Sequence, residues 1–90
     1  MITLVDFSAA LVCDWKADSD GDGDEETLIG EYLSAAECAN QCMARTATNS
    51  TINGATRRKS DGKCWCEMGM SAQVASDVYN SCYFTGGKNV

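Results

Sequence analysis

The sequence contains no histidine, few basic residues and no long apolar run, and each absence argues against a class of function. Without histidine, the chain lacks the side chain that most often serves as a general base near neutral pH. Seven basic residues stand against thirteen acidic ones, and the net charge of −6 disfavours nucleic-acid binding, which needs a dominant basic face. No apolar run approaches the roughly 20 residues of a bilayer-spanning helix, so we expect no membrane insertion.

The first residues also lack the features of a signal peptide. Met1–Asp6 contains no lysine or arginine, and its sixth residue is already acidic. We therefore expect that a leader preceded the mature chain and was removed.

Six cysteines are the most informative feature that is present. Ninety residues predict a single domain over 1–90, with a core that is too small to be stable through apolar packing alone. An even number of cysteines in such a chain predicts disulfides and an oxidising, secreted or extracellular location. The alternative of a zinc site is disfavoured because Cys38 and Cys42, and Cys64 and Cys66, do not have zinc-finger spacings.

The first half of the chain predicts two short strands around an acidic loop. Leu11–Trp15 is the clearest strand-like stretch of the apolar N-terminal segment, and Thr27–Leu33 is the second strand. Residues 18–26 hold six acids and two glycines, so we expect a solvated loop that buries nothing.

The best helix signal lies in the middle of the chain. Ser34 and Glu37 form a capping box that begins a helix over Ala35–Arg45, with Leu33 positioned to pack against its first turn. This helix places Cys38 and Cys42 on one face, four residues apart.

The second half predicts a hairpin and a closing strand. Ile52–Arg58 and Lys63–Met68 flank the turn signal Asp61-Gly62. The segment from Met70 is expected to be irregular until Tyr79–Phe84 forms the last strand, and residues 86–90 are expected to fray.

Six cysteines allow 15 connectivities, and geometry favours one of them. A helix lying on the hairpin brings Cys38 and Cys42 to the same-face pair Cys64 and Cys66. The nested solution joins Cys42 to Cys64 inside a Cys38–Cys66 bond. The remaining bond, Cys13–Cys82, closes the two ends. The Cys42–Cys64 bond would close a loop of about 23 residues and stabilise the fold by roughly 3 kcal/mol. The Cys13–Cys82 bond would close a loop of about 70 residues and contribute roughly 4.5 kcal/mol.

Several short segments of the sequence resemble those of a PAN/apple domain. They are SAAECANQC at Ser34–Cys42, INGAT at Ile52–Thr56 and CWCE at Cys64–Glu67, followed by MGMS and SCYF. The resemblance, which spans roughly residues 10–85, implies an α+β fold in which one helix packs across an antiparallel sheet. The related N-terminal domains of plasminogen and hepatocyte growth factor belong to the same group.

Members of this family are extracellular modules that bind proteins or carbohydrates and are not enzymes by themselves. Two features of the chain depart from the family pattern. One is the acidic insertion at residues 18–26, and the other is Arg57, which stands where an aromatic residue is common.

Four cations lie within seven residues at the hairpin turn, and they suggest an anion site. The candidate residues for binding a sulfated glycan are Arg57, Arg58, Lys59 and Lys63. The alternatives are an ordinary solvated turn, or one that pairs with the acidic loop of the same molecule.

The acidic loop resembles a calcium-binding loop in part. Asp18, Asp20, Asp22 and Asp24 occupy its odd positions and Gly23 its sixth, but position 12 is Ile29 instead of glutamate. The candidate ligands are those four aspartates, and the alternative is a charged loop that only aids solubility.

The remaining candidates are a glycan acceptor, an aromatic patch and a carboxylate pair. Asn49 begins an N-glycosylation triplet on an expected surface loop. Trp65 lies between two cysteines and is expected to be partly buried or to cover a disulfide. Glu67 and Asp61 could be imagined as a catalytic carboxylate pair, but nothing in the sequence buries or positions them.

The sequence therefore predicts a secreted or cell-surface recognition or adhesion module without catalytic activity. Its expected partner is an extracellular protein or a carbohydrate, and no cofactor is expected beyond weak calcium. A free-standing secreted effector, such as a signalling peptide, pheromone-like ligand or toxin, is the second hypothesis. A calcium-dependent component of the extracellular matrix is the third.

Overall fold

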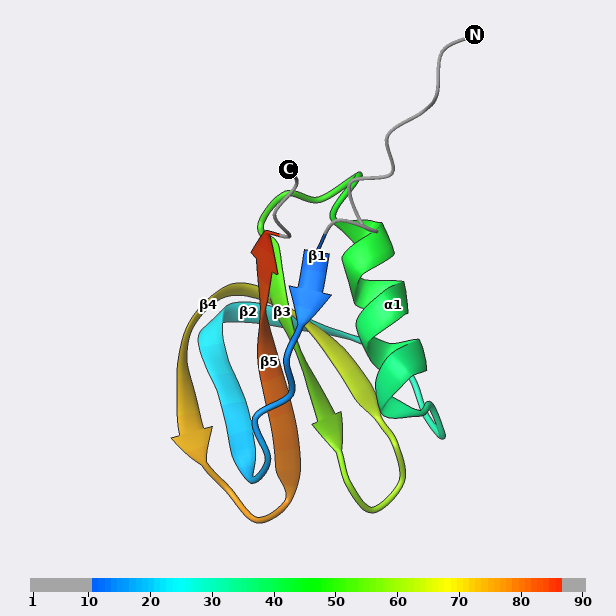
Figure 1. The fold of residues 1–90 in the computed structure, drawn as a ribbon, viewed down its shortest axis with the longest axis vertical. Helices are drawn as coiled ribbons and strands as arrows, with labels where there is room; N and C mark the ends of the chain where they lie inside the picture. The colour runs from blue at the N-terminus through cyan, green and yellow to red at the C-terminus, as the bar shows by residue number, and fades with distance from the viewer. Residues whose placement is uncertain (1–10, 87–90) are drawn as a thin grey trace, which may run out of the picture.

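The computed structural model describes residues 11–86, which form a five-stranded antiparallel sheet and one helix (Figure 1). The sheet order is β1-β5-β3-β4-β2. The elements are β1 (Leu11–Cys13), β2 (Ser19–Gly30), α1 (Ala35–Arg45), β3 (Ile52–Arg58), β4 (Cys64–Ala75) and β5 (Tyr79–Gly86). The expected α+β class with one helix on an antiparallel sheet is confirmed. The apolar segment before Leu11 and most of the tail expected to fray lie outside the described residues.

The helix α1 begins where the capping box places it. Ser34 Oγ accepts from the Glu37 amide at 3.0 Å, and Glu37 Oε1 accepts from the Ser34 amide at 2.8 Å. These bonds satisfy two of the amides that have no partner inside the helix. Leu33 is half-buried and packs against the cluster that contains Cys38, as expected of a residue just before the helix.

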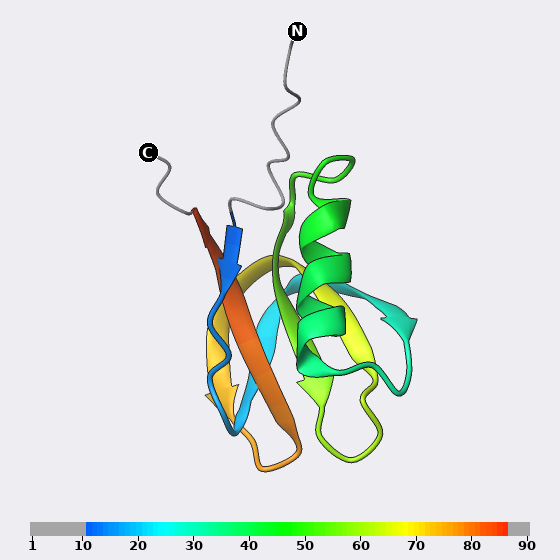
Figure 2. The same ribbon diagram turned by 45° about the vertical axis from the view of Figure 1, so that its right-hand side comes forward.

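The core between α1 and the sheet is made largely of sulfur. The five cysteines of α1, β4 and β5 and Ala55 of β3 are fully buried, and Ile52 of β3 is nearly so. Figure 2 shows the helix lying along one face of the sheet, in front of β3. Few large apolar side chains are buried there, so covalent cross-links supply stability that the packing cannot.

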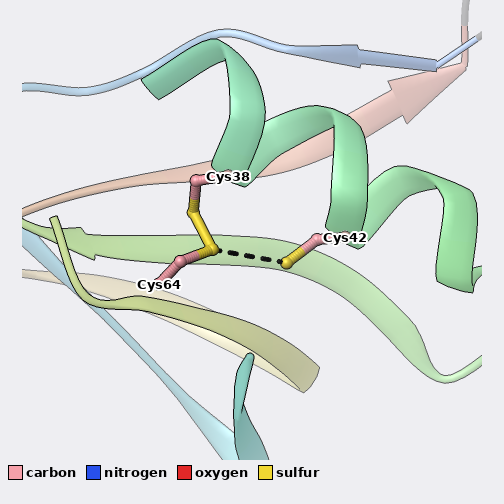
Figure 3. Close-up of side chains that lie close together, drawn as sticks. All are labelled: Cys38, Cys42 and Cys64. Carbon is pink, nitrogen blue, oxygen red and sulfur yellow. Dashed lines mark hydrogen bonds between the residues drawn. A yellow bond between two sulfur atoms is a disulfide. The ribbon is translucent and has the colours of Figure 1, made fainter. Parts of the chain in front are cut away.

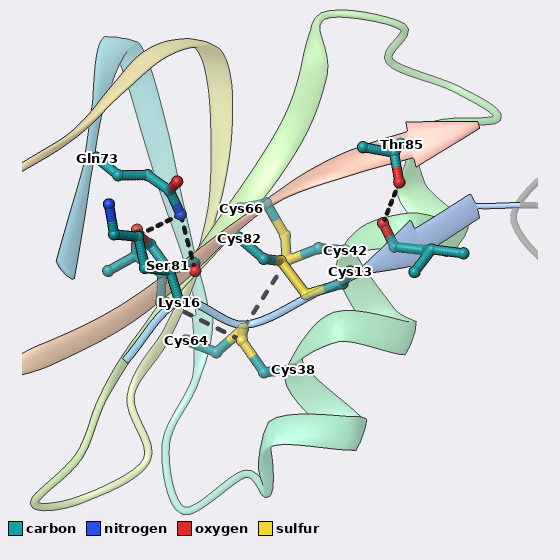
Figure 4. The surroundings of a disulfide bond; sticks show 12 residues. Cys13, Lys16, Cys38, Cys42, Cys64, Cys66, Gln73, Ser81, Cys82 and Thr85 are labelled. Carbon is teal, nitrogen blue, oxygen red and sulfur yellow. Dashed lines mark hydrogen bonds between the residues drawn. A yellow bond between two sulfur atoms is a disulfide. The ribbon is translucent and has the colours of Figure 1, made fainter. Parts of the chain in front are cut away.

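The disulfides confirm one predicted pair and contradict two. Cys13 bonds to Cys82 as predicted, but the nested pairs Cys38–Cys66 and Cys42–Cys64 are wrong. The structure joins Cys38 to Cys64 and Cys42 to Cys66, with Cα separations of 5.6 and 5.3 Å (Figure 4). The connection after α1 reverses the chain into β3, and the hairpin reverses it again. The helix therefore runs in the same direction as β4, and the cysteines pair in sequence order.

The acidic segment is not a loop. Its residues from Ser19 onward form the first half of β2 and pair with the second half of β4, which was also expected to be irregular. Ser19 is 1% exposed and Gly21 is buried, while the acids alternate with them toward solvent. The small residues that point inward let β2 approach the sheet closely. Because β2 is an edge strand, its outward charges also discourage pairing with the strands of other chains.

This half of β2 folds over the face of the sheet that points away from α1. Ser19 Oγ lies 2.6 Å from Ser81 Oγ, and the Gly21 amide donates to Thr56 Oγ1 at 3.2 Å. A β-carbon at Gly21 would lie 2.6 Å from Thr56 Oγ1, so only glycine allows this approach. Figure 1 shows β4 and β2 curving away together from the rest of the sheet. The fold-back creates a second surface, which is called the outer face below.

Candidate functional site

The cations of the hairpin turn are largely engaged within the molecule. The Arg58 guanidinium forms two bonds to the Asp61 carboxylate, at 2.7 and 3.0 Å, and Lys59 pairs with Asp18. Arg57 Nε donates to the Leu33 carbonyl oxygen at 2.7 Å. The Arg58 hydrogen bonds, with the Lys63 amide, hold the pKa of Asp61 at about 2. The predicted anion site is therefore not assembled from four free cations.

Only two of the predicted cations, Arg57 and Lys59, come together, along a groove of about 410 Å³. The groove runs between the turn and the start of α1. Its other principal walls are Tyr32, Ser34, Glu37 and Asp61. Two positive and two negative side chains line it, so its charge is nearly balanced. Arg58 lies on the outer face, 5.9 Å from the Trp65 ring centre.

Tyr32 is the most exposed large hydrophobic side chain of the described residues, with 81% of its surface accessible. Its backbone adopts φ +59°, a left-handed conformation that costs a non-glycine residue about 1–2 kcal/mol. The Tyr32 amide donates to the Asp61 carbonyl oxygen at 2.8 Å, which holds the residue at the groove. Sequence reasoning placed Tyr32 inside a strand and missed it; the end of β2 at Gly30 leaves it free.

The turn itself depends on glycine. Gly62 has φ +68°, and a β-carbon there would lie 2.7 Å from the Leu33 carbonyl oxygen. The Leu33 amide donates to the Gly62 carbonyl oxygen at 3.2 Å. The turn signal of the sequence therefore also positions the loop that carries Tyr32.

The four aspartates of the predicted calcium loop do not converge. Asp18 lies in the turn before β2, with φ +56°, while Asp20, Asp22 and Asp24 follow one another along the strand, where alternate residues are about 6.7 Å apart. Asp18 pairs with Lys59, Asp20 faces the outer pocket described next, and Asp22 and Asp24 are exposed. A calcium loop requires a chain that curls around the ion, and strand pairing with β4 prevents this here.

The outer face carries a small pocket of about 60 Å³ between β2, β3, β4 and β5. Asp20, Glu26, Thr56, Trp65 and Tyr79 line it. The Trp65 and Tyr79 rings meet edge to face, with centres 5.8 Å apart. Trp65 is half-buried, which confirms the expectation for this residue.

Glu67 is the side chain that sequence reasoning misjudged most. It is 1% exposed, and its Oε2 accepts from Thr56 Oγ1 at 2.7 Å, so the interpretation that nothing buries or positions it was wrong. Burial removes water from the carboxyl group and raises its pKa to about 8; nearby Glu26 and Asp20 act in the same direction. Asp61 is bound to Arg58 in the turn, so the two carboxylates do not form a catalytic pair.

Asn49 follows the helix in a turn and is half-buried. Its Oδ1 accepts from the Thr51 amide at 3.1 Å, and its Nδ2, the atom that would carry a glycan, lies 3.4 Å from Met68 Sδ. Glycosylation at this position stays a prediction.

The sulfur atoms of Cys38, Cys42 and Cys64 lie within 4.8 Å of one another, which is close enough for a metal site (Figure 3). All of them are bonded in disulfides, however, and the described residues contain no free cysteine. A metal needs thiolates, so this cluster is structural.

No family of proteins, no curated protein and no solved structure matches this chain. Over residues 11–86, no helix has the length and apolar character needed to cross a membrane.

Proposed function

We propose that this protein is a PAN/apple-like extracellular recognition module that binds a protein or carbohydrate partner without catalysing a reaction. The groove beside the hairpin turn is its contact surface, with Tyr32 as the central side chain.

The conformation of Tyr32 is the observation that carries this proposal. Its side chain leaves 81% of its surface to solvent, so it gives the fold little packing, while its backbone is strained. Strained backbone is concentrated at functional sites, where the surrounding structure holds it in place. Tyrosine is also enriched at binding hot spots because it offers a large, rather rigid surface and a hydroxyl group.

The groove favours a partner that is not strongly charged. Its two cations and two acids balance, and Arg57 and Lys59 already contact Leu33 and Asp18. A volume of about 410 Å³ is in the range of small-ligand sites, so a sugar ring or a few residues of a peptide loop would fit. This argues for a neutral glycan or a mixed protein surface over a sulfated glycan.

The disulfides support the extracellular location. Such bonds form and persist in oxidising compartments, and all six cysteines are paired. Together with the short chain, they are typical of small secreted domains.

The test is a glycan array run in parallel with a pull-down from secreted proteins, using the wild type and Tyr32→Ala. A specific partner that the variant loses would support the proposal. Val78→Ala is the matched control, because Val78 is 44% exposed but lies outside the groove. A partner that binds both variants as tightly as the wild type would contradict the assignment of the groove.

A further inference from the structure

Glu26 and Glu67 lie directly opposite each other in the pairing of β2 with β4. Directly opposed residues of an antiparallel pair point to the same face, with β-carbons about 5 Å apart. Like charges at such positions destabilise the sheet. Here one of the two side chains is also withdrawn from water, because Glu67 is 1% exposed.

No cation offsets this arrangement among the described residues that face Glu67. On β2 it is approached by Glu26 and Asp20, on β3 by the Thr56 hydroxyl, and Tyr79 of β5 lines the adjoining pocket. Arg58, the cation of the outer face, is bound to Asp61. A buried carboxylate without a counter-charge is strongly disfavoured, whereas a protonated carboxyl group is tolerated.

The same carboxyl group also anchors the fold-back of β2. The Gly21 amide donates to Thr56 Oγ1 at 3.2 Å, and Thr56 Oγ1 donates to Glu67 Oε2 at 2.7 Å. This chain of bonds links the first half of β2, through β3, to the centre of β4. Asp20, next to Gly21, and Glu26, further along β2, line the adjoining pocket and act on the same carboxyl group.

We propose that a proton on Glu67 holds the first half of β2 in place over the sheet. Loss of this proton allows the segment to move away from the sheet. The opening uncovers the walls of the outer pocket, including Trp65 and Tyr79. This device is separate from the groove that carries Tyr32, so it goes beyond the proposed function and does not depend on it.

The direction of the pH effect follows from proton binding. The raised pKa of about 8 belongs to the closed state, while the exposed group returns to its ordinary value of 4.5. The closed state therefore binds more protons between these two values, and the opening equilibrium rises about tenfold for each pH unit in that window. Above about pH 8 both states have lost the proton, and the equilibrium levels off.

Hydrogen exchange of the Gly21 amide measures this opening in the intact protein. After correction for the intrinsic exchange rate, we expect its protection to fall about tenfold per pH unit from pH 5 to 8 and then to stay constant. We also expect it to be lower than that of the Cys42 amide in α1, which reports global unfolding. Glu67→Gln, which keeps an oxygen for Thr56 but cannot ionise, should remove the slope.

The wild type alone can overturn the proposal, even if the variant folds poorly. Protection of Gly21 that does not change between pH 5 and 8 would overturn the proposal. So would equal protection of the Gly21 and Cys42 amides at every pH, because β2 would then not open separately. A slope that persists unchanged in a folded Glu67→Gln variant would assign the proton to another group, which also overturns it.

Discussion

Cys42 Sγ lies 3.8 Å from Cys64 Sγ, although each sulfur is bonded to a different partner. The two helix-to-sheet disulfides lie side by side, so the distance between these two sulfurs does not by itself exclude a Cys42–Cys64 bond. The direction of α1 relative to β4 decides between the two pairings. A connectivity measurement therefore tests the topology of the fold as well as its covalent structure.

Partial reduction followed by alkylation and mass spectrometry should show Cys38 joined to Cys64, and Cys42 joined to Cys66. Replacing Cys42 and Cys66 together by alanine should lower the free energy of unfolding by about 3 kcal/mol, because that bond closes a loop of 24 residues. The nested pairing, if found, would mean that the helix runs opposite to β4.

Local chemistry allowed much of the fold to be predicted from the sequence. The capping box of Ser34 and Glu37 marks the start of α1, and the Asp61-Gly62 signal marks the β3–β4 turn, because both depend on residues a few positions apart. The pairing of the helix cysteines failed because it depends on the direction of α1, which is set by two chain reversals and not by the spacing of the cysteines.

The outer face could not be predicted for a different reason. Aspartate and glycine have low strand propensity, so local propensity predicts a loop for residues 18–26. Pairing with β4 overrides that preference, and the alternation of Ser19 and Gly21 with acids was the available signal. Once β2 was mistaken for a loop, nothing remained to bury Glu67. Tyr32 was missed because the end of β2 is set by the docking of the next residues on the hairpin turn.

Gly21→Ala should destabilise the fold-back of β2. The new methyl group would lie 2.6 Å from Thr56 Oγ1, at the centre of the bonds that connect Gly21, Thr56 and Glu67. We expect a loss of about 1–3 kcal/mol in the free energy of unfolding, measured by urea denaturation. Gly86→Ala is the control, since no atom lies within 4 Å of its added carbon and its effect should be close to zero. Equal stability of the two variants would show that Gly21 is not tightly packed.

The stability of the whole protein should fall as the pH rises from about 5 to 8. The folded state raises the pKa of Glu67 to about 8, so it holds a proton that the unfolded chain has lost, and that contribution disappears through this window. Thermal denaturation at constant ionic strength measures the trend, and Glu67→Gln should flatten it. A wild type whose melting temperature rises toward pH 8 would show that Glu67 is already ionised in the fold.

Tyr32→Gly should separate binding from stability. Glycine relieves a backbone strain of about 1–2 kcal/mol at φ +59° but gains about 0.5–1 kcal/mol of entropy in the unfolded chain. The variant should therefore be as stable as the wild type, or up to about 1.5 kcal/mol more stable, while partner binding is lost. Tyr79→Ala should instead lower stability, because Tyr79 is half-buried against Trp65. A large loss of stability in Tyr32→Gly would mean that the tyrosine serves the fold.

The cations of the hairpin turn should not retain the wild type on heparin at about 0.15 M salt, because Arg58 and Lys59 are held by Asp61 and Asp18 and the net charge is −6. Replacing both aspartates by asparagine should create salt-sensitive retention by freeing these side chains. The control is Asp22→Asn with Asp77→Asn, which changes the net charge equally but leaves both ion pairs intact. Retention of both double variants to the same degree would attribute binding to overall charge. Retention of the wild type itself would show that Arg57 and Lys63 are sufficient for a sulfated ligand.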